Sequence, residues 1–291
     1  MNLPLDTLLQ SATSGLLMGA AYALIAVGFS IVFGVMNIVN FAHGHLVMAA
    51  MFLSYALYRW AGVDPYVSAL IVLPAFLAVG AALYKTVIAP IVNASQAAQL
   101  LSTLGLLIVI ENLANLLFGA DMRSVNVAYA SQSWRLLGVV LPIGKLVAAL
   151  GSLAAIGGVW ALLRYTRFGA EIRAAADNQL GALLVGVSIG KVFLHAFAIA
   201  TATAAIAGLL LLPFYLVNPF LGHDFMLKAF VIAILGGLGS LPGALVAGLL
   251  VGVLEAAGGL FLSASLGNAL VFALLLVVLL IRPRGLFGKP A

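Results

Sequence analysis

Four hydrogen-bonding side chains interrupt an apolar stretch near the start of the chain. Asn37, Asn40, His43 and His45 lie within nine residues, whereas no Asp, Glu, Lys or Arg occurs from residue 7 to residue 58. Two imidazoles could begin a zinc site, but His43 and His45 lack a convincing third ligand in the sequence, so no metal is expected. We predict that the four side chains line or gate a polar path, or that they cap a helix at a simple turn.

Two acids lie within apolar runs and are the next candidates for chemistry. Glu111 stands in L-L-I-V-I-E-N-L-A-N, and Glu255 stands in G-V-L-E-A-A-G-G. An ionisable group surrounded by apolar residues is costly to bury and marks a functional site by default. Each acid also falls toward the end of its run, so the alternative is that its carboxylate reaches out to a polar interface.

Motifs for covalent or nucleotide chemistry are absent from the sequence. The Gly-Lys pairs at 144–145, 190–191 and 288–289 lack the earlier Gly and the following Ser or Thr of a phosphate-binding loop. There is no H-E-x-x-H motif, no pair of carboxylates that suggests hydrolysis, no signal for a Ser-His pair, and no cysteine. We therefore expect no enzyme activity and no cofactor bound by this chain itself.

The composition indicates that the surrounding solvent is lipid. Of the 291 residues, 65% are hydrophobic and only 7% are charged, whereas soluble domains carry roughly 25% charged residues. The 13 Lys and Arg are scattered between apolar runs, which argues against a nucleic-acid partner. We predict an all-α polytopic membrane protein in which residues 1–291 form a single domain.

About eight hydrophobic segments are expected, because a spanning helix needs about 20 apolar residues. They lie near residues 11–33, 42–58, 66–84, 99–118, 146–163, 192–212, 228–258 and 262–281. Gly15 and Gly19 share helix-packing spacing, as do Gly248 and Gly252, and this spacing lets helix backbones approach closely in lipid.

The segment 228–258 contains a break. Gly236, Gly237 and Gly239, together with Pro242, do not continue a regular helix comfortably. Irregular backbone at membrane depth survives only where it is buried in protein or lines a wet cavity, and broken helices often mark transport paths. A tight turn at the membrane surface is the alternative.

Basic residues suggest the orientation. The 164–191 connection carries four Lys or Arg and the tail carries three, so both are expected on the inner side and the N-terminus on the outer side. This orientation requires an odd number of crossings in 228–281. Either 228–241 crosses as a short helix, or 228–258 contains a re-entrant turn.

The connection itself predicts an amphipathic helix from Ala170 to Val185. Ala-Ala-Ala is a strong helix former, and Ile172, Ala176 and Leu180, with Leu183 or Leu184, fall on one face. Such a helix could dock into a groove on a partner protein, or lie on lipid headgroups.

Four motifs in register carry a family resemblance that covers essentially the whole chain. They are the run from Gly15 to Leu46, the loop R-F-G-A-E-I-R-A-A-A-D-N, the stretch K-A-F-V-I-A-I-L-G-G-L-G-S-L-P-G-A, and the closing R-P-R-G-L-F-G. The chain resembles permease subunits of bacterial branched-chain amino acid ABC importers, specifically the smaller, LivH-type permease. These motifs are less specific for the solute, since relatives import urea, short amides or aromatic acids.

The resemblance implies an ABC importer permease fold in a bacterial inner membrane and a set of partners. These are a larger homologous permease (LivM-like), two ATPases (LivG-like and LivF-like) that bind ATP and Mg²⁺, and a periplasmic substrate-binding protein. The segment that matches the family's ATPase-coupling stretch departs from the common E-A-A-x-x-x-G form, because Ile172 and Arg173 follow Glu171. The residues it implies for coupling are Glu171, Arg173, Ala174, Ala175, Asp177, Asn178 and Gly186.

The pathway hypothesis follows from the same resemblance. A zwitterionic amino acid needs hydrogen-bond partners in transit, whereas a deep fixed charge would retain it. The residues proposed to line the path are Asn37, Asn40, His43, His45, Glu111, Gly236, Gly237, Gly239 and Glu255. The rival from another class is a stand-alone channel or secondary transporter for small neutral solutes. An ion-coupled carrier would be expected to have a better buried acid, or an inverted repeat, than the sequence displays.

Overall fold

The computed structural model describes residues 5–136, 139–261 and 264–288. In these ranges six helices are long and apolar enough to cross a membrane, by length and composition. They are Asp6–Met36, Ala69–Ile91, Gln96–Phe118, Ile143–Tyr165, Ile189–Phe214 and Leu241–Phe261. The prediction of an all-α polytopic membrane protein is confirmed.

The elements follow one another along the chain with short connections. The first half contains α1 (Leu5–Met36), α2 (His43–Ala61), α3 (Ala69–Leu83), the π-helical turn η1 (Tyr84–Ile88), α4 (Ala89–Ile91), α5 (Gln96–Phe118) and α6 (Ala128–Ser131), followed by the antiparallel strands β1 (Ser133–Leu136) and β2 (Val139–Pro142). The second half contains α7 (Ile143–Tyr165), α8 (Arg167–Asp177), α9 (Gln179–Leu184), α10 (Ile189–Leu211), the 3-10 turn η2 (Leu212–Phe214), α11 (Leu221–Gly236), α12 (Leu241–Phe261) and α13 (Ala264–Ile281).

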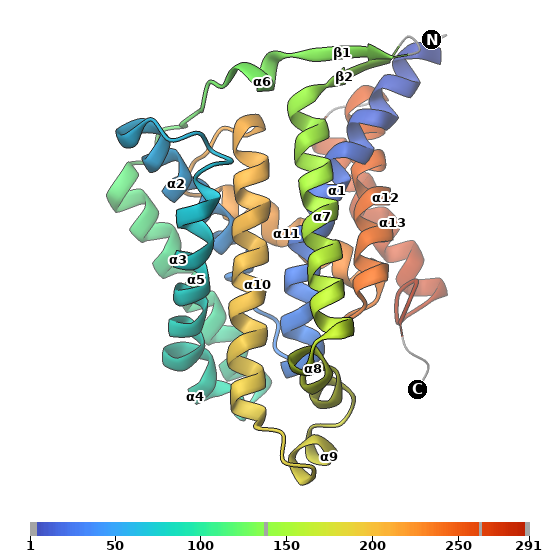
Figure 1. The fold of residues 1–291 in the computed structure, drawn as a ribbon. Coiled ribbons are helices and arrows are strands. Elements are labelled where there is room, and N and C mark those ends of the chain that lie inside the picture. Colours follow the sequence, from blue (N-terminus) through green and yellow to red (C-terminus); the bar gives the residue numbers. More distant parts are fainter. Residues whose placement is uncertain (1–4, 137–138, 262–263, 289–291) are drawn as a thin grey trace.

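The two ends of the bundle differ in what they carry. The N-terminus, α6 and the β1–β2 hairpin lie at one end, and α8, α9 and the C-terminus lie at the other (Figure 1). The hairpin is attached to α1, because the Gln10 amide donates to the Val140 carbonyl at 2.5 Å and accepts from the Val140 N–H at 2.7 Å. We call these the hairpin end and the α8–α9 end.

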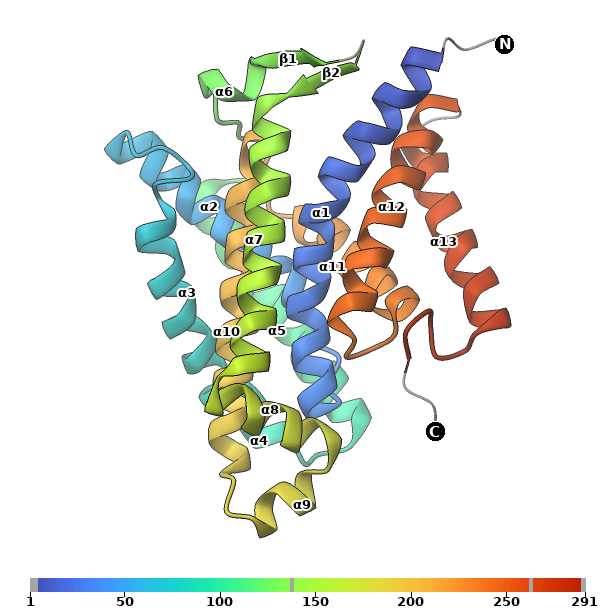
Figure 2. The ribbon, with the colours of Figure 1, turned by 45° about the vertical axis from the view of Figure 1, so that its right-hand side comes forward.

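The glycine pairs predicted from spacing are confirmed as a helix crossing. α1 and α12 lie side by side in both views (Figures 1 and 2). A Cβ on Gly15 would lie 2.5 Å from the Gly252 carbonyl oxygen, and one on Gly19 would lie 2.6 Å from the Gly248 carbonyl oxygen. Only glycine lets the two backbones come this close.

The predicted break within 228–258 is confirmed. α11 ends at Gly236, and the chain turns through residues 237–240 before α12 begins at Leu241. Gly237 and Gly239 adopt φ values of +98° and +82°, a region that disfavours side chains. α11 therefore runs toward the α8–α9 end as a short helix, and α12 returns (Figure 1). Every other predicted segment corresponds to one helix.

The predicted continuous helix Ala170–Val185 is also wrong, because it is interrupted at Asn178. Asn178 has extended backbone angles, and its side-chain oxygen accepts from the Gly181 N–H at 2.9 Å, which starts α9. A free side-chain acceptor competes with helix continuation and favours a new N-cap. The buried face of α8 is Gly169, Ile172 and Ala175, whereas Ala176, predicted on this face, is exposed.

An inverted repeat underlies the architecture. Val39–His45 reads V-N-F-A-H-G-H, and Val217–His223 reads V-N-P-F-L-G-H. In each copy the Asn side chain accepts from the N–H two residues on, at 3.1 Å for Asn40 and 2.9 Å for Asn218, and a helix begins three residues after the Asn.

The flanking helices extend this repeat. α1 precedes the first copy and runs toward the α8–α9 end, whereas α10 precedes the second copy and runs away from it (Figure 1). We call α2 and α11, which begin at the two V-N-x-x-x-G-H segments, the half-helices. The helix that follows each half-helix packs on the first helix of the other copy: α3 packs on α10, and α12 packs on α1. The expectation that no inverted repeat is present is therefore wrong: α1–α2–α3 and α10–α11–α12 are two copies of one unit in opposite orientations.

Candidate translocation and coupling sites

A cluster of three ionisable side chains lies where the two copies of the repeat meet. The Glu111 Oε2 atom lies 3.2 Å from His45 Nε2 and 2.7 Å from His223 Nε2. The two imidazole rings stand edge to face with centroids 4.7 Å apart. The His45 side chain is fully buried, that of Glu111 is 18% exposed, and that of His223 is 50% exposed. Glu111 is thus held by imidazoles, and the pathway hypothesis for Glu111 and His45 stays a prediction.

The backbone explains why these rings meet. His45 and His223 occupy the same place in the first turn of α2 and of α11. Each follows a glycine, and those glycines pack against the facing helix. A Cβ on Gly44 would lie 2.2 Å from the Gly222 carbonyl oxygen, and one on Gly222 would lie 2.6 Å from the His45 ring. Because side chains in a helix point toward its N-terminus, both rings project to the crossing point, where α5 supplies Glu111.

The electrostatics of this cluster suit either a retained carboxylate or a bound cation. Each helix first turn stabilises a nearby negative charge by about 0.3–1 kcal/mol. The three ligand atoms of His45, Glu111 and His223 all lie within 4.8 Å of one another, so the group could hold a metal ion. Sequence reasoning discounted a metal because it sought a third ligand for the pair His43 and His45. The structure instead gives His45 two partners, from α5 and α11, and leaves His43 outside the group.

His43 and Asn40 are buried parts of the helix packing. His43 is fully buried, and its Nε2–H donates to the Ile25 carbonyl of α1 at 3.0 Å. Asn40 is 1% exposed and uses its side-chain oxygen to start α2. The alternative interpretation of these two residues, as helix-start and packing residues, fits their surroundings, and their role in a path stays a prediction.

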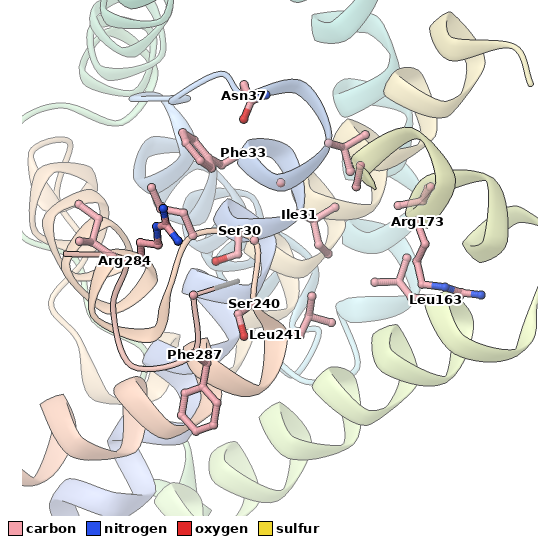
Figure 3. Close-up of a pocket in the computed structure, with 18 of the residues that line it drawn as sticks. Ser30, Ile31, Phe33, Asn37, Leu163, Arg173, Ser240, Leu241, Arg284 and Phe287 are labelled. Atoms are coloured by element: carbon pink, nitrogen blue, oxygen red, sulfur yellow. The ribbon is translucent and has the colours of Figure 1, made fainter. Parts of the chain in front are cut away.

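Asn37 occupies a different environment, at the edge of a large cavity. Its φ of +55° ends α1. The cavity has a volume of about 630 Å³ and lies between the end of α1, α8, the α11–α12 turn and the C-terminal tail. Figure 3 shows Arg173 on one side of it and Arg284 and Phe287 on the other, with Ser30 and Ser240 between.

The glycines Gly236, Gly237 and Gly239 form the turn beside this cavity. Gly239 lines it, and the tail packs on the other two. The Leu286 and Phe287 N–H groups donate to the carbonyls of Leu235 and Gly236, at 2.8 and 3.0 Å. The tail thereby satisfies carbonyls that the end of α11 leaves open. The turn lies beside α8 and the C-terminal tail, and a pathway role for the three glycines stays a prediction.

Glu255 is held by a lysine from the neighbouring helix. Lys228 Nζ lies 2.6 Å from the carboxylate and donates to the Tyr22 hydroxyl at 3.1 Å. That hydroxyl is 2.6 Å from the hydroxyl of Tyr215. The side chains of Lys228 and Glu255 are 15% and 28% exposed. The pair neutralises both charges in the bundle, and its role in transport stays a prediction.

The coupling segment presents one buried face and one open apolar end. Ala175 packs into the bundle, while Glu171, Arg173, Asp177 and Asn178 are exposed. Ala174 is half-buried, and Gly186 has a φ of +89° in the turn after α9. The large apolar side chains of α9 and its end are exposed by 55–80%: Leu180, Leu183, Leu184 and Val185. The Gln179 side chain donates to the Val35 carbonyl at 3.1 Å, so α9 is linked to the end of α1.

Sequence reasoning missed several polar residues of α5 and α11. His223, Asp224 and Lys228 on α11 were read as part of a loop and an apolar run. Comparing the two V-N-x-x-x-G-H segments would have drawn attention to His223 as the counterpart of His45. Asn112, beside Glu111 on α5, was also passed over and is exposed.

Comparison with known proteins agrees with this architecture. The family described as branched-chain amino acid transport system / permease component matches residues 11–279. The high-affinity branched-chain amino acid transport system permease protein LivH of Escherichia coli (strain K12) is 32% identical, over 97% of this chain and 96% of its own. The corresponding protein BraD of Pseudomonas aeruginosa is 30% identical, over 97% and 96%.

A probable branched-chain amino acid transport permease protein LivH of Methanocaldococcus jannaschii is 26% identical, over 91% of this chain and 88% of its own. No solved structure gives a significant match. The family match spans nearly the whole chain, including both copies of the repeat and the coupling segment. The chain therefore belongs to the family of branched-chain amino acid transport permeases.

Proposed function

We propose that this chain is the permease subunit of an ATP-driven, binding-protein-dependent importer of amino acids, branched-chain or otherwise hydrophobic, in a bacterial inner membrane. It forms half of the translocation path and couples to cytoplasmic ATPases. The names of its relatives favour amino acids over urea, amides or aromatic acids. Family membership favours a permease subunit over a stand-alone channel or secondary transporter.

One observation carries the proposal: polar side chains on the candidate spanning helix α5 and at the start of α11 are exposed on the surface of the chain. Asn112 and Asn115 on α5 are exposed, as are His223 and Asp224 at the start of α11. Polar groups are costly against hydrocarbon and almost always face protein or water. In our proposal the exposed asparagines of α5, together with His223, which contacts Glu111 of the same helix, lie on the side covered by a second, homologous permease (LivM-like), with a wet path between the two subunits.

The α8–α9 end supports the coupling role. Four large apolar side chains on a short helix and its end, exposed to water, form a docking patch rather than a stable free surface. In our proposal this patch, residues 180–185, sits in a groove of an ATPase subunit (LivG-like or LivF-like). The periplasmic binding protein delivers the solute at the hairpin end.

Movement follows from a difference in binding and involves no covalent chemistry in this chain. ATP and Mg²⁺ bind to the ATPases and draw them together. The α9 docking patch follows that motion, and the Gln179 contact passes it to the end of α1. The balance between the outward-facing and inward-facing states of the membrane helices shifts only to the extent that ATP binds one state more tightly than the other.

The test compares two exposed apolar residues at opposite ends of the bundle. Leu184 in the docking patch is 80% exposed, and Val67 at the hairpin end is 56% exposed. The complex is purified from native membranes in mild detergent and reconstituted with the binding protein. Leu184→Glu should abolish ATPase co-purification and ATP-dependent leucine uptake, whereas Val67→Glu should retain ATPase binding. Recovery of the wild-type chain alone, moving solute in liposomes without ATP, would overturn the proposal.

A further inference from the structure

We infer that His45, Glu111 and His223 form a binding site for a divalent transition-metal ion of the zinc kind. Two imidazole nitrogens and one carboxylate oxygen are an established ligand set for zinc with an open coordination position. Imidazole ligands suit zinc, copper, iron and nickel, whereas magnesium and calcium prefer oxygen ligands. The inference concerns ion binding and stands apart from the transport proposal.

Two of the three separations between ligand atoms are near those around a coordinated ion, and all three lie within 4.8 Å. Ligand atoms around a tetrahedral zinc lie about 3.3 Å apart, given bonds of about 2.0–2.1 Å. Here Glu111 Oε2 lies 3.2 Å from one Nε2 atom and 2.7 Å from the other. Small rotations of the half-exposed His223 side chain would open the shorter distance. Each imidazole then ligates through Nε2 and keeps its proton on Nδ1.

The burial pattern gives the site a rigid base and an open side. His45 is fully buried, and its ring is pressed against Gly222 of the facing half-helix. Glu111 is largely covered, and the two imidazoles hold its carboxylate. His223 is half exposed on the outward polar face. An ion can enter from that side, and its fourth position faces the same way.

The site also joins elements that are otherwise loosely connected. α2 and α11 cross directly, whereas α5 packs chiefly on α2 and reaches α11 through the Glu111–His223 contact. Coordination would replace the His45–Glu111 hydrogen bond and the His223–Glu111 ion pair with three metal–ligand bonds, and it would fasten α5 to both α2 and α11. A ligand that binds only the folded form raises its thermal stability, so the ion should raise the melting temperature of the chain.

The first test is a Co²⁺ titration of the purified full chain in detergent, followed by visible absorption. We expect one Co²⁺ per chain, the intense visible bands of four- or five-coordinate cobalt, and their loss when Zn²⁺ is added. Glu111→Gln and His223→Asn should each weaken binding by more than about 100-fold, since even second-shell changes cost about 10–100-fold. His195→Asn is the matched control, because His195 is an exposed histidine outside the cluster.

A second variant exchanges one proposed ligand for another that has its own spectroscopic signature. The chain contains no cysteine, so His223→Cys supplies a single thiolate at a half-exposed position that tolerates substitution. Its Co²⁺ complex should gain a thiolate charge-transfer band in the near ultraviolet. Wild-type protein without the visible bands or a metal-induced rise in melting temperature would overturn the inference. Bands that persist unchanged in Glu111→Gln and His223→Cys would also overturn it, because they would place the ion elsewhere.

Discussion

The crossing of α2 and α11 makes a quantitative prediction about one methyl group. In Gly44→Ala the new Cβ would lie 2.2 Å from the Gly222 carbonyl oxygen and 2.3 Å from the Met226 nitrogen. Carbon atoms in good contact lie about 3.5–4.0 Å from their neighbours, so the two half-helices must separate by more than about 1 Å. Both obstructing groups are backbone atoms, which do not rotate away.

The energetic cost of Gly44→Ala follows from this displacement. Overpacking a close contact costs about 1–3 kcal/mol, and occasionally more. With backbone on both sides we expect about 3 kcal/mol, which lowers the ratio of folded to unfolded protein roughly 100-fold. Gly44 directly precedes His45, so the separation should also break the His45–Glu111 contact.

The assay is denaturant or thermal unfolding of the purified chain in detergent, with Gly105→Ala as the control. A Cβ on Gly105 meets nothing within 4 Å. In a helix interior this change should leave stability unaltered or raise it by up to about 1 kcal/mol. Neutral surface changes alter the free energy of unfolding by up to about 0.5 kcal/mol. If Gly44→Ala changes it by no more than that, the close crossing is wrong.

Three further predictions concern single contacts. Lys228→Met leaves the Glu255 carboxylate unpaired and should lower the free energy of unfolding by about 3–5 kcal/mol. Adding Glu255→Gln should restore most of that loss. A double variant no more stable than Lys228→Met alone would contradict the pairing. Asn37→Val places a branched side chain at a φ of +55° and should cost about 1–2 kcal/mol, whereas Asn37→Gly should be neutral in the same unfolding assay. Asn178→Ala removes the cap of α9 at a cost of about 1 kcal/mol, seen as faster amide hydrogen exchange in α9; unchanged exchange would contradict its capping role.

The sequence predicts the long helices well because lipid enforces their length and apolar composition. Gly15 and Gly19, with Gly248 and Gly252, were predictable as candidate close-packing positions from their spacing, although glycine is common in membrane helices; the contact between the two pairs required the structure. The break at Asn178 was harder to predict. Ala-Ala-Ala before it favours helix continuation, and only the competition of one side-chain acceptor for the Gly181 N–H ends α8.

The candidate site was only partly predictable because its members come from three helices. Periodicity describes one helix at a time, so it placed Glu111 and His45 in polar positions without indicating that they touch. His223 lay in a stretch read as a loop followed by an apolar run. Its role depends on a helix that begins at Leu221 inside the bundle. Only comparison of the two halves of the chain could have brought His45 and His223 together.

The helix α5, which lies outside the inverted repeat, explains why the cluster is asymmetric. The two copies supply equivalent histidines, yet the His45 side chain is fully buried and that of His223 is 50% exposed. α5 lies outside the repeat and delivers Glu111 to one side of the crossing, so one histidine is enclosed and the other faces the outward polar side.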